Sequence, residues 1–343
     1  MTGKGCGEVE LRTLRYFVAV LEAGSLSRAA SLLYVAQPAL TAQIKKLEQE
    51  LSTQLFERSY AGVTPTAAGM QLYQDACKLL SDANAMQERL QRSPDGPEGS
   101  VTVAIPFLLS SLLMGPLLFR LKKAYPRIRV FVIDGLSLTV RKAMLDRRAD
   151  IGILVDTAEL ADLDVRPFAC EAMYVCGFDK EGEIAALTQA QAKSGVEPEV
   201  PFSKAAALPL VLQSRRFSIR SRVEETAADM GIDLNIEHEY DSARIIRSLY
   251  LAGAGFTFTP ACALADGPKN DGHWMAARVM EPELLRRYFL ALPRTQEPSS
   301  ATLAVLEALV DEARSMIDAG RWKAEFLFKQ KTPPKSSKRS SQV

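Results

Sequence analysis

Residues 9–69 predict the fold of the N-terminal part and read VELRTLRYFVAVLEAGSLSRAASLLYVAQPALTAQIKKLEQELSTQLFERSYAGVTPTAAG. Apolar residues recur in this stretch at the i, i+3, i+4, i+7 spacing of short amphipathic helices. Three helices are predicted, and the apolar residues on their inner faces are as follows: Leu14, Phe17, Val18 and Leu21 in the first, Leu26, Ala29, Ala30 and Leu33 in the second, and Leu40, Ile44, Leu47 and Leu51 in the third. Gly24 is a typical helix stop, Ser25 a typical N-cap, and Pro38 fits the first turn of a third helix. Residues 25–47 therefore have the helix-turn-helix pattern, whose second helix can lie in the major groove of DNA.

The outer face of this helix pair is basic. Arg28, Lys45 and Lys46 are the charged residues between positions 25 and 47, and this local charge suits a phosphate backbone. If the apolar stripe faces inward, the outer face of the second helix carries Gln37, Pro38, Thr41, Ala42 and Lys45. Gln can read adenine, Thr a base edge or a thymine methyl, and Lys phosphate or guanine. Helix pairs with a polar outer face are common, so periodicity alone leaves DNA binding and a merely structural pair equally open.

A single long helix is predicted over residues 65–92. Apolar residues repeat there at spacings of 4, 3, 4, 3 and 4, which is a heptad seam, at Leu72, Ala76, Leu79, Ala83, Met86 and Leu90. The stripe could pack on its own domain, but no other local helix is apparent to cover it. We therefore predict that it pairs with a second copy of the chain, followed by a linker over residues 93–97.

Residues 98–325 alternate predicted strands with helical patterns, which indicates an α/β fold with largely parallel sheets. The candidate strands are residues 101–105, 129–133, 151–155, 174–178, 209–212, 256–259 and 288–292. About 220 residues are enough for two such sheets. Residues 179–204 are interpreted as a surface helix and loop, and residues 329–343, basic and rich in Ser and Pro, as a disordered tail.

Composition excludes several other classes of protein. In 343 residues, 42 Lys and Arg balance 41 Asp and Glu, so DNA binding requires local segregation of charge. Five scattered cysteines and two histidines argue against a disulfide scaffold or a zinc site. The uncharged segment 101–119 is nearly long enough to span a membrane, but Pro106 and Pro116 divide it, and we interpret it as a buried strand, a turn and a buried helix. With no signal peptide apparent, we expect a cytoplasmic protein.

Residues 9–69 closely resemble the N-terminal domain of the LysR-type transcriptional regulators. The matching segments are LRYFVAV, GSLSRAA, AQPAL, QIKKLEQEL, LFER and TPTAAG. Further along, RADIGIL and EYDSARIIRSLYLAGAGFTFTP resemble the two lobes of the family's effector domain. The segment AGRWKAEF resembles the end of a subgroup that responds to nitrogen status and carboxylates.

The resemblance implies a winged helix-turn-helix domain over residues 9–66, with the helix-turn-helix at 26–45, and a dimerising linker helix over 65–92. It also implies a two-lobed α/β effector domain, like a periplasmic binding protein, over 98–325. Lobe 1 is expected at about 98–168 and 268–325, and lobe 2 at about 169–267.

The same resemblance implies a set of DNA-contacting residues. Gln37, Pro38 and Thr41 fall where the family's recognition helix meets bases, Arg28 and Lys45 near phosphates, and Arg58 on a wing that enters the minor groove. The full predicted set is Ser27, Arg28, Gln37, Pro38, Thr41, Lys45, Arg58 and Thr64. Many members carry Ser then Arg where this chain has Thr41 and Ala42, so a common arginine base contact is missing. Ser52 also replaces a frequent Gly, a helix stop.

A small organic anion is the expected effector, because helix N-termini and strand ends converge on the cleft between such lobes. The candidate contacts are Ser110, Ser111, Ser137, Arg220 and Thr257, with Arg220 placed to clamp a carboxylate. Each Ser could instead be a plain helix N-cap and Arg220 a solvated charge. Cys170 and Cys176 could form a redox pair, but buried small side chains fit their positions better.

The predicted function is therefore sequence-specific, effector-responsive transcription regulation rather than catalysis. Its predicted partners are double-stranded DNA, a small-molecule effector and further copies of the chain, as a dimer or tetramer, with no membrane and no cofactor. The sequence shows no Gly-x-Ser-x-Gly or Gly-Lys-Ser/Thr motif. The alternative is a two-lobed binding protein or enzyme in which residues 1–90 serve only oligomerisation. Steep salt dependence of binding to random duplex DNA would separate the two.

Overall fold

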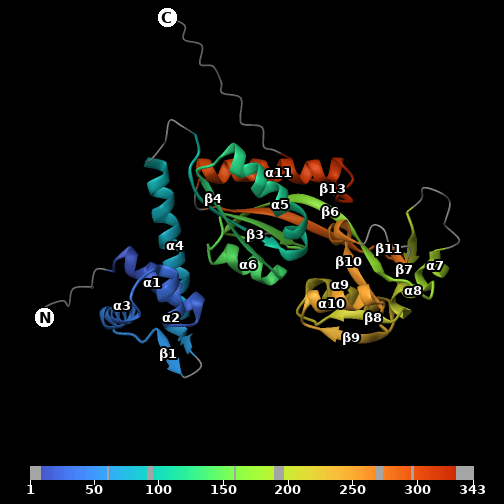
Figure 1. Ribbon diagram of the computed structural model, residues 1–343, viewed down its shortest axis with the longest axis horizontal. Helices are drawn as coiled ribbons and strands as arrows, with labels where there is room; N and C mark the ends of the chain where they lie inside the picture. Colours follow the sequence, from blue (N-terminus) through green and yellow to red (C-terminus); the bar gives the residue numbers. More distant parts are fainter. Residues whose placement is uncertain are drawn as a thin grey trace, which may run out of the picture.

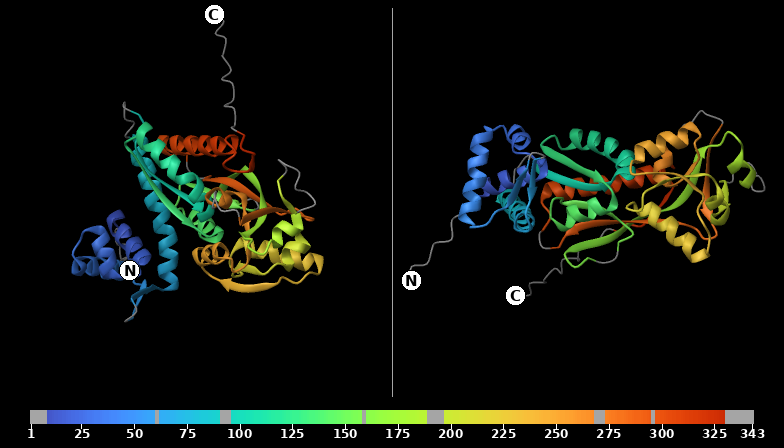
Figure 2. Two further views of the ribbon diagram at one scale, coloured as in Figure 1. Left: turned by 45° about the vertical axis from the view of Figure 1, so that its right-hand side comes forward. Right: turned by 90° about the horizontal axis from the view of Figure 1, so that it is seen from below.

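The computed structural model describes residues 9–59, 62–90, 96–157, 160–188, 197–267, 273–294 and 297–329. The N-terminal unit, a long helix and two α/β lobes follow one another along the molecule (Figure 1). Seen from below in the right-hand view of Figure 2, the N-terminal unit, lobe 1 and lobe 2 lie in a row. Within the described part of the chain, no helix has both the length and the apolar composition needed to cross a bilayer.

The N-terminal unit is a winged helix-turn-helix. Its elements are α1 (Leu11–Ala23), α2 (Leu26–Leu33), α3 (Gln37–Glu50), β1 (Phe56–Ser59), β2 (Gly62–Pro65) and α4 (Ala67–Leu90). The three predicted helices are confirmed, and Leu14, Phe17, Leu40, Ile44 and Leu47 are buried in one core. Gly24 ends α1 in the left-handed conformation, as predicted. Strands β1 and β2 pair antiparallel and form the wing.

The long helix begins two residues later than predicted. Thr64 and Pro65 belong to β2, and the Thr66 hydroxyl caps α4 by accepting a hydrogen bond from the Gly69 N–H at 3.0 Å. The expectation that no local helix covers the apolar stripe is also wrong, because α1 packs on the first half of α4. Tyr73 and Ala76 are buried in the core of the N-terminal unit, and Leu72 packs against it.

Lobe 1 has a sheet of mixed direction. Its elements are β3 (Gly99–Pro106), α5 (Phe107–Ala124), β4 (Ile128–Gly135), α6 (Ser137–Leu145), β5 (Ile151–Val155), β12 (Leu285–Pro293), α11 (Ser300–Asp318) and β13 (Ala324–Phe326). Strands β3, β4 and β5 are parallel, whereas β12 runs antiparallel to β5. Pro116 does not divide the apolar segment after β3 as predicted, because α5 continues through it. The absent proline N–H costs one helical hydrogen bond, and the buried apolar face of α5 offsets this loss.

Lobe 2 is reached along one continuous strand, β6 (Leu163–Phe178), which pairs with β12 in lobe 1 and then with β10 and β11 in lobe 2. The other elements of lobe 2 are α7 (Glu183–Thr188), β7 (Glu199–Pro201), α8 (Phe202–Ala207), β8 (Leu210–Gln213), α9 (Ser218–Met230), β9 (Ile236–Tyr240), α10 (Ala243–Ala252), β10 (Phe256–Pro260), the 3₁₀ helix η2 (Ala261–Asp266) and β11 (Trp274–Met280). Strands β8, β9 and β10 are parallel, and β6 runs antiparallel to β10.

The predicted lobe boundary at residue 268 is wrong. Strand β11 pairs with β6 and β7 in lobe 2, and its buried side chains Ala277 and Val279 belong to the lobe 2 core. Apart from η2, which packs against α5 and places Cys262 in the lobe 1 core, the chain returns to lobe 1 with β12. Two strands, β6 and β12, thus connect the lobes. Of the predicted tail, only Lys329 lies within the described residues.

Candidate nucleic-acid interface and effector pocket

The helix-turn-helix geometry follows from three local features. The Ser25 hydroxyl caps α2 by accepting a hydrogen bond from the Arg28 N–H at 3.4 Å. Tyr34 ends α2 with a φ of 55°, in the left-handed region, and this reversal turns the chain toward α3. Pro38 then occupies the first turn of α3, where its missing N–H has no helical partner to lose. The turn between α2 and α3 therefore covers residues 34–36.

The predicted DNA-contacting face of α3 is open to solvent. Gln37, Pro38, Ala42 and Lys45 are exposed. Thr41 is half-buried, and its hydroxyl donates to the Gln37 carbonyl at 2.9 Å. Arg28 and Ser27 are exposed on α2. These side chains can reach a ligand as large as a duplex without rearrangement of the core.

The wing stands beside this face. Arg58 pairs through its backbone with Val63, although the side chain of Arg58 lies outside the described part of the structure. Thr64 is exposed on β2. The Val63 N–H donates to the carbonyl of Gly24 at 3.1 Å and ties the wing to the turn between α1 and α2. This hydrogen bond fixes the wing relative to the helix pair.

The apolar seam on α4 is narrower than predicted. Ala76 is fully buried in its own domain, so it cannot contact a second copy. Leu79 and Met86 are the large apolar side chains that remain open, at 52% and 51% exposure, with the half-buried Ala83 between them. They follow one another at i, i+4 and i+7 and define an unpartnered stripe. The side chain of Leu90 lies outside the described residues.

Between the lobes lies a small pocket at the N-termini of three helices. Its walls are Pro106 at the end of β3, Phe107 and Leu108 of α5, Gly135 at the end of β4, Leu136 and Ser137 at the start of α6, Phe217, Ser218 and Ile219 at the start of α9, and Arg286 of β12. The N-cap residues of α5, α6 and α9 are Pro106, Leu136 and Phe217, and none caps its helix through a side chain. Free backbone N–H groups therefore converge here, as is typical of anion sites.

The pocket is closed across the lobes. The Ser137 and Ser218 hydroxyls, one from each lobe, lie 3.1 Å apart and share a hydrogen bond. At its edge, Arg222 of α9 pairs with Asp156 after β5 at 3.7 Å. We call these two contacts the interlobe clasp. The remaining cavity is about 20 Å³, enough for one water molecule.

Of the five predicted effector contacts, Ser137 is the one that lines this pocket. Ser110 and Ser111 lie one turn inside α5, because the helix begins at Phe107, and the Ser111 hydroxyl donates to the Phe107 carbonyl at 3.1 Å. Thr257 is buried inside the lobe 2 sheet, where its hydroxyl has no hydrogen-bond partner among the described residues. These three side chains therefore do not line the interlobe pocket.

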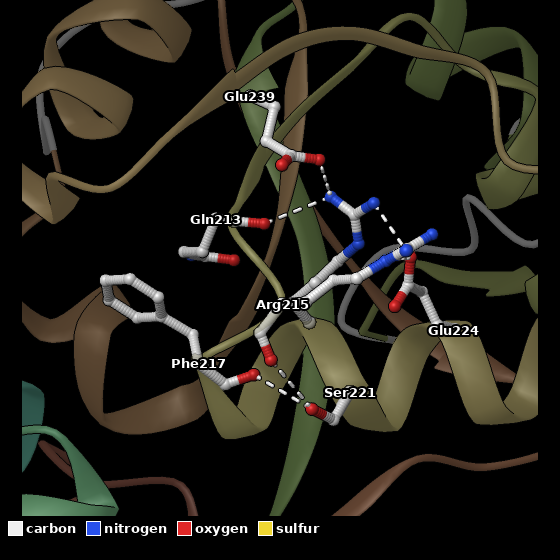
Figure 3. A network of polar contacts seen from close by, with 7 residues as sticks. Gln213, Arg215, Phe217, Ser221, Glu224 and Glu239 are labelled. Atoms are coloured by element: carbon white, nitrogen blue, oxygen red, sulfur yellow. Dashed lines mark hydrogen bonds and ion pairs between the residues drawn. The ribbon is translucent and has the colours of Figure 1, made fainter.

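Figure 3 shows Gln213, Glu224 and Glu239 around one guanidinium, which the hydrogen bonds identify as that of Arg220. Arg220, predicted to clamp a carboxylate, does not line the interlobe pocket. It is 3% exposed, and its guanidinium donates to the Gln213 carbonyl at 3.0 Å and to Glu224 and Glu239 at 2.8 Å each. Burial alone would raise the pKa of Glu224, but hydrogen bonds from Arg220 and Arg215 hold it below its ordinary value. Arg220 therefore stabilises the link between α9, β8 and β9.

Arg286 is the cation of the pocket, and it was not among the residues predicted from the sequence. The side chain is 7% exposed, and its Nε has no hydrogen-bond partner in the described part of the chain. Burial alone would lower its pKa, but Tyr288, Cys262, Glu171 and Asp156 together raise it, so the guanidinium stays charged. The strand predicted over residues 288–292 begins two residues after Arg286, whereas β12 begins at Leu285. The available signal was an arginine pair at the start of an otherwise apolar segment, LRRYFLALP.

A buried network fixes the two connecting strands behind Arg286. Glu171 on β6 is 2% exposed and accepts hydrogen bonds from the Trp322 indole and the Cys262 N–H, at 2.7 Å each, and from the Tyr288 hydroxyl. Burial raises the pKa of Glu171. Because these groups come from β6, η2, β12 and the C-terminal segment, the network braces the strands at the point where they pass between the lobes.

An exposed recognition helix with a wing, joined to a two-lobed α/β domain, defines the class of DNA-binding transcriptional regulators with a ligand-binding domain. Family models agree. Residues 11–70 match the "Bacterial regulatory helix-turn-helix protein, lysR family", and residues 94–314 match the "LysR substrate binding domain". The chain belongs to the LysR family. It is a DNA-binding transcriptional regulator that responds to a small-molecule effector, and not an enzyme.

Individual relatives support this assignment along most of the chain. The nitrogen assimilation regulatory protein nac of Klebsiella aerogenes is 27% identical over 304 residues, 88% of this chain and 94% of the relative. The regulator BudR of Raoultella terrigena is 31% identical over 258 residues, 73% and 83% of the two chains. A full-length OxyR variant from Pseudomonas aeruginosa has the same fold, with a TM-score of 0.68, 22% identity and coverage of 95% and 99%. CbnR in complex with its target DNA has the same fold, with a TM-score of 0.60 and 23% identity, and the match covers 90% of this chain and 99% of CbnR.

Proposed function

We propose that the protein binds its operator as a dimer, with α3 of each subunit in the major groove and the wing at the adjacent minor groove. The exposed face of α3 carries this proposal, because Gln37 and Lys45 lie open on it beside Arg28 of α2. Two such helices related by two-fold symmetry read half-sites about 34 to 36 Å apart. As a regulator acting on chromosomal DNA, the protein works in the cytoplasm.

The stripe of Leu79, Ala83 and Met86 on α4 supports the dimer. Two large apolar side chains that are half-exposed in one chain gain burial when two α4 helices pack together. Dimers can pair further into tetramers through other surfaces. The mass of the full chain in solution, measured with and without operator DNA, tests the stoichiometry, and a monomer under both conditions would contradict it.

We further propose that the effector is a small organic anion held between the lobes. The three helix N-termini without side-chain caps support this proposal, since they offer N–H donors and positive dipole ends to a negative group. The effector acts by binding one arrangement of the lobes better than another. DNA footprints recorded with and without small anions test the coupling, and an unchanged footprint for an anion that binds would contradict it.

A further inference from the structure

We propose that Arg286 is the counter-ion of the effector and that the interlobe pocket selects a carboxylate. The inference rests on the proposed effector site and names its chemistry. Arg286 is more than nine-tenths buried, lines the pocket and leaves Nε without a partner in the described part of the chain. A buried guanidinium with a free donor is costly unless a ligand completes its hydrogen bonds.

The geometry favours a carboxylate over an uncharged ligand. Guanidinium is a planar fork of N–H donors that matches a carboxylate through two parallel hydrogen bonds. The opposite walls of the pocket add the N-termini of α5, α6 and α9, whose positive dipole ends also favour an anion. Glu171 does not occupy this role, because its two oxygens accept from Trp322, Cys262 and Tyr288. The pocket thus has more positive than negative groups available to a ligand.

The walls restrict the remainder of the ligand. Phe107, Leu108, Phe217 and Ile219 supply apolar surface, whereas Ser137 and Ser218 supply hydroxyl groups. A ligand with one carboxylate and a short, partly apolar body fits this composition. Since the cavity of about 20 Å³ holds a single water molecule, such a ligand enters only when the lobes separate and the hydrogen bond between Ser137 and Ser218 breaks.

The test uses the full chain and three pairs of probes that differ in charge. Sodium acetate, benzoate and succinate are compared with acetamide, benzamide and succinamide at equal ionic strength, by calorimetry and by the shift in unfolding temperature. We expect at least one of the carboxylates to bind and to raise the unfolding temperature, and its amide to do neither. Binding of amides as strongly as carboxylates, or no binding by any carboxylate, would overturn the assignment. Binding of sodium phosphate in place of all three carboxylates would overturn the carboxylate class.

Variants of Arg286 locate the interaction. Arg286→Gln should weaken carboxylate binding on the order of 100-fold, and Arg286→Lys, which keeps the charge without the fork, should weaken it by about tenfold. Arg287→Gln is the matched control, because Arg287 is the next residue of β12 and is exposed. Full binding by folded Arg286→Gln or Arg286→Lys would place the carboxylate elsewhere.

Failure of this inference is distinguishable from failure of the proposed function. The DNA affinity of the wild-type chain is measured in the same preparations. DNA binding without carboxylate binding overturns the role of Arg286 and leaves DNA recognition standing. If the folded wild-type chain binds neither DNA nor a carboxylate, the proposed function itself is contradicted.

Discussion

On α3, Gln37 and Lys45 present two different chemistries to DNA. The Gln37 amide can make a bidentate contact with adenine, whereas the Lys45 ammonium is a point charge suited to phosphate. We predict that Gln37→Ala weakens binding to the specific operator by about 1 to 3 kcal/mol and changes random-DNA binding little. Lys45→Ala should weaken both and reduce the salt dependence. Titrations on both duplexes give the measurement, and equal losses for Gln37→Ala would remove it from base reading.

For Arg220, stability rather than ligand affinity is the expected readout. Arg220→Met removes a donor from the Gln213 carbonyl and from two carboxylates, of which Glu224 keeps its bond from Arg215, so we expect a loss of about 3 kcal/mol in the free energy of unfolding. The matched control is Arg216→Met, which breaks a solvent-exposed pair with Asp241 and should cost less than about 1 kcal/mol. Urea unfolding measures both, and equal losses would contradict a structural role for Arg220.

Glu224 gives this network a pH dependence. Its pKa is held below the ordinary value of 4.5 in the folded chain. A carboxyl with a lowered folded pKa contributes stability that is present above its unfolded pKa and is lost as the pH falls through the folded value. The stability difference between wild type and Arg220→Met should therefore be constant above about pH 5 and shrink below pH 4.5. A difference that grows on acidification would contradict the ion-pair assignment.

For single residues, the sequence predicted the place in the fold better than the direction in which the side chain points. Ser137 and Arg220 lie in the first turns of α6 and α9, among the helix N-termini that were expected to face the cleft. Which way each side chain points depends on its neighbours, and for Arg220 these are Glu224 on the same helix and Glu239 on a strand that was not predicted. Arg286 lay outside the predicted strand, because a charged residue in a buried strand contradicts the apolar pattern on which strand prediction relies.

Among the elements, α4 combines two packing faces. One face carries Tyr73 and Ala76 into the N-terminal core, and the other leaves Leu79 and Met86 half-exposed. We predict that Leu79→Asp weakens dimerisation, because a charge would be buried between paired helices at a cost of several kcal/mol. Gln74→Asp introduces a carboxylate at another exposed position of α4 and serves as control. An unchanged sedimentation mass for Leu79→Asp would show that this stripe is not the interface.

The spacing of apolar residues predicted the helices and strands that have one apolar face or are apolar throughout. It did not predict those in which apolar residues are few. The three N-terminal helices and strands such as β3 and β5 were predictable because burial is regular along them. Strand β9 reads IEHEY and lies at the edge of the lobe 2 sheet, where none of its side chains is fully buried. Its alternation is short and includes one aliphatic residue, Ile236, so the pattern is too weak to mark a strand. The heptad predicted on α4 combined residues that face the N-terminal core with residues that face solvent. The spacing of apolar residues within α4 does not reveal its contact with α1, which is distant in sequence.

In the whole molecule, the lobes are joined by two strands and held closed by the interlobe clasp. Because the Asp156 and Arg222 pair lies outside the pocket wall, its removal shifts the lobe equilibrium without touching the ligand. We predict that Arg222→Gln tightens carboxylate binding by up to about fivefold, as expected for an exposed pair worth up to about 1 kcal/mol. Arg216→Gln, within lobe 2, should leave affinity unchanged. Weaker binding by Arg222→Gln would contradict opening of the lobes on ligand entry.

Sequence-specific recognition of DNA by α3 is tested by comparing the affinities of the full chain for two duplexes. Duplexes bound by the full chain are selected from a random pool, and the affinity for the selected sequence is compared with that for a shuffled duplex across a range of salt concentrations. We predict that the selected duplex binds on the order of 1,000-fold more tightly or better, and that both affinities fall steeply with salt. Equal affinities for the two duplexes at every salt concentration would contradict sequence-specific recognition.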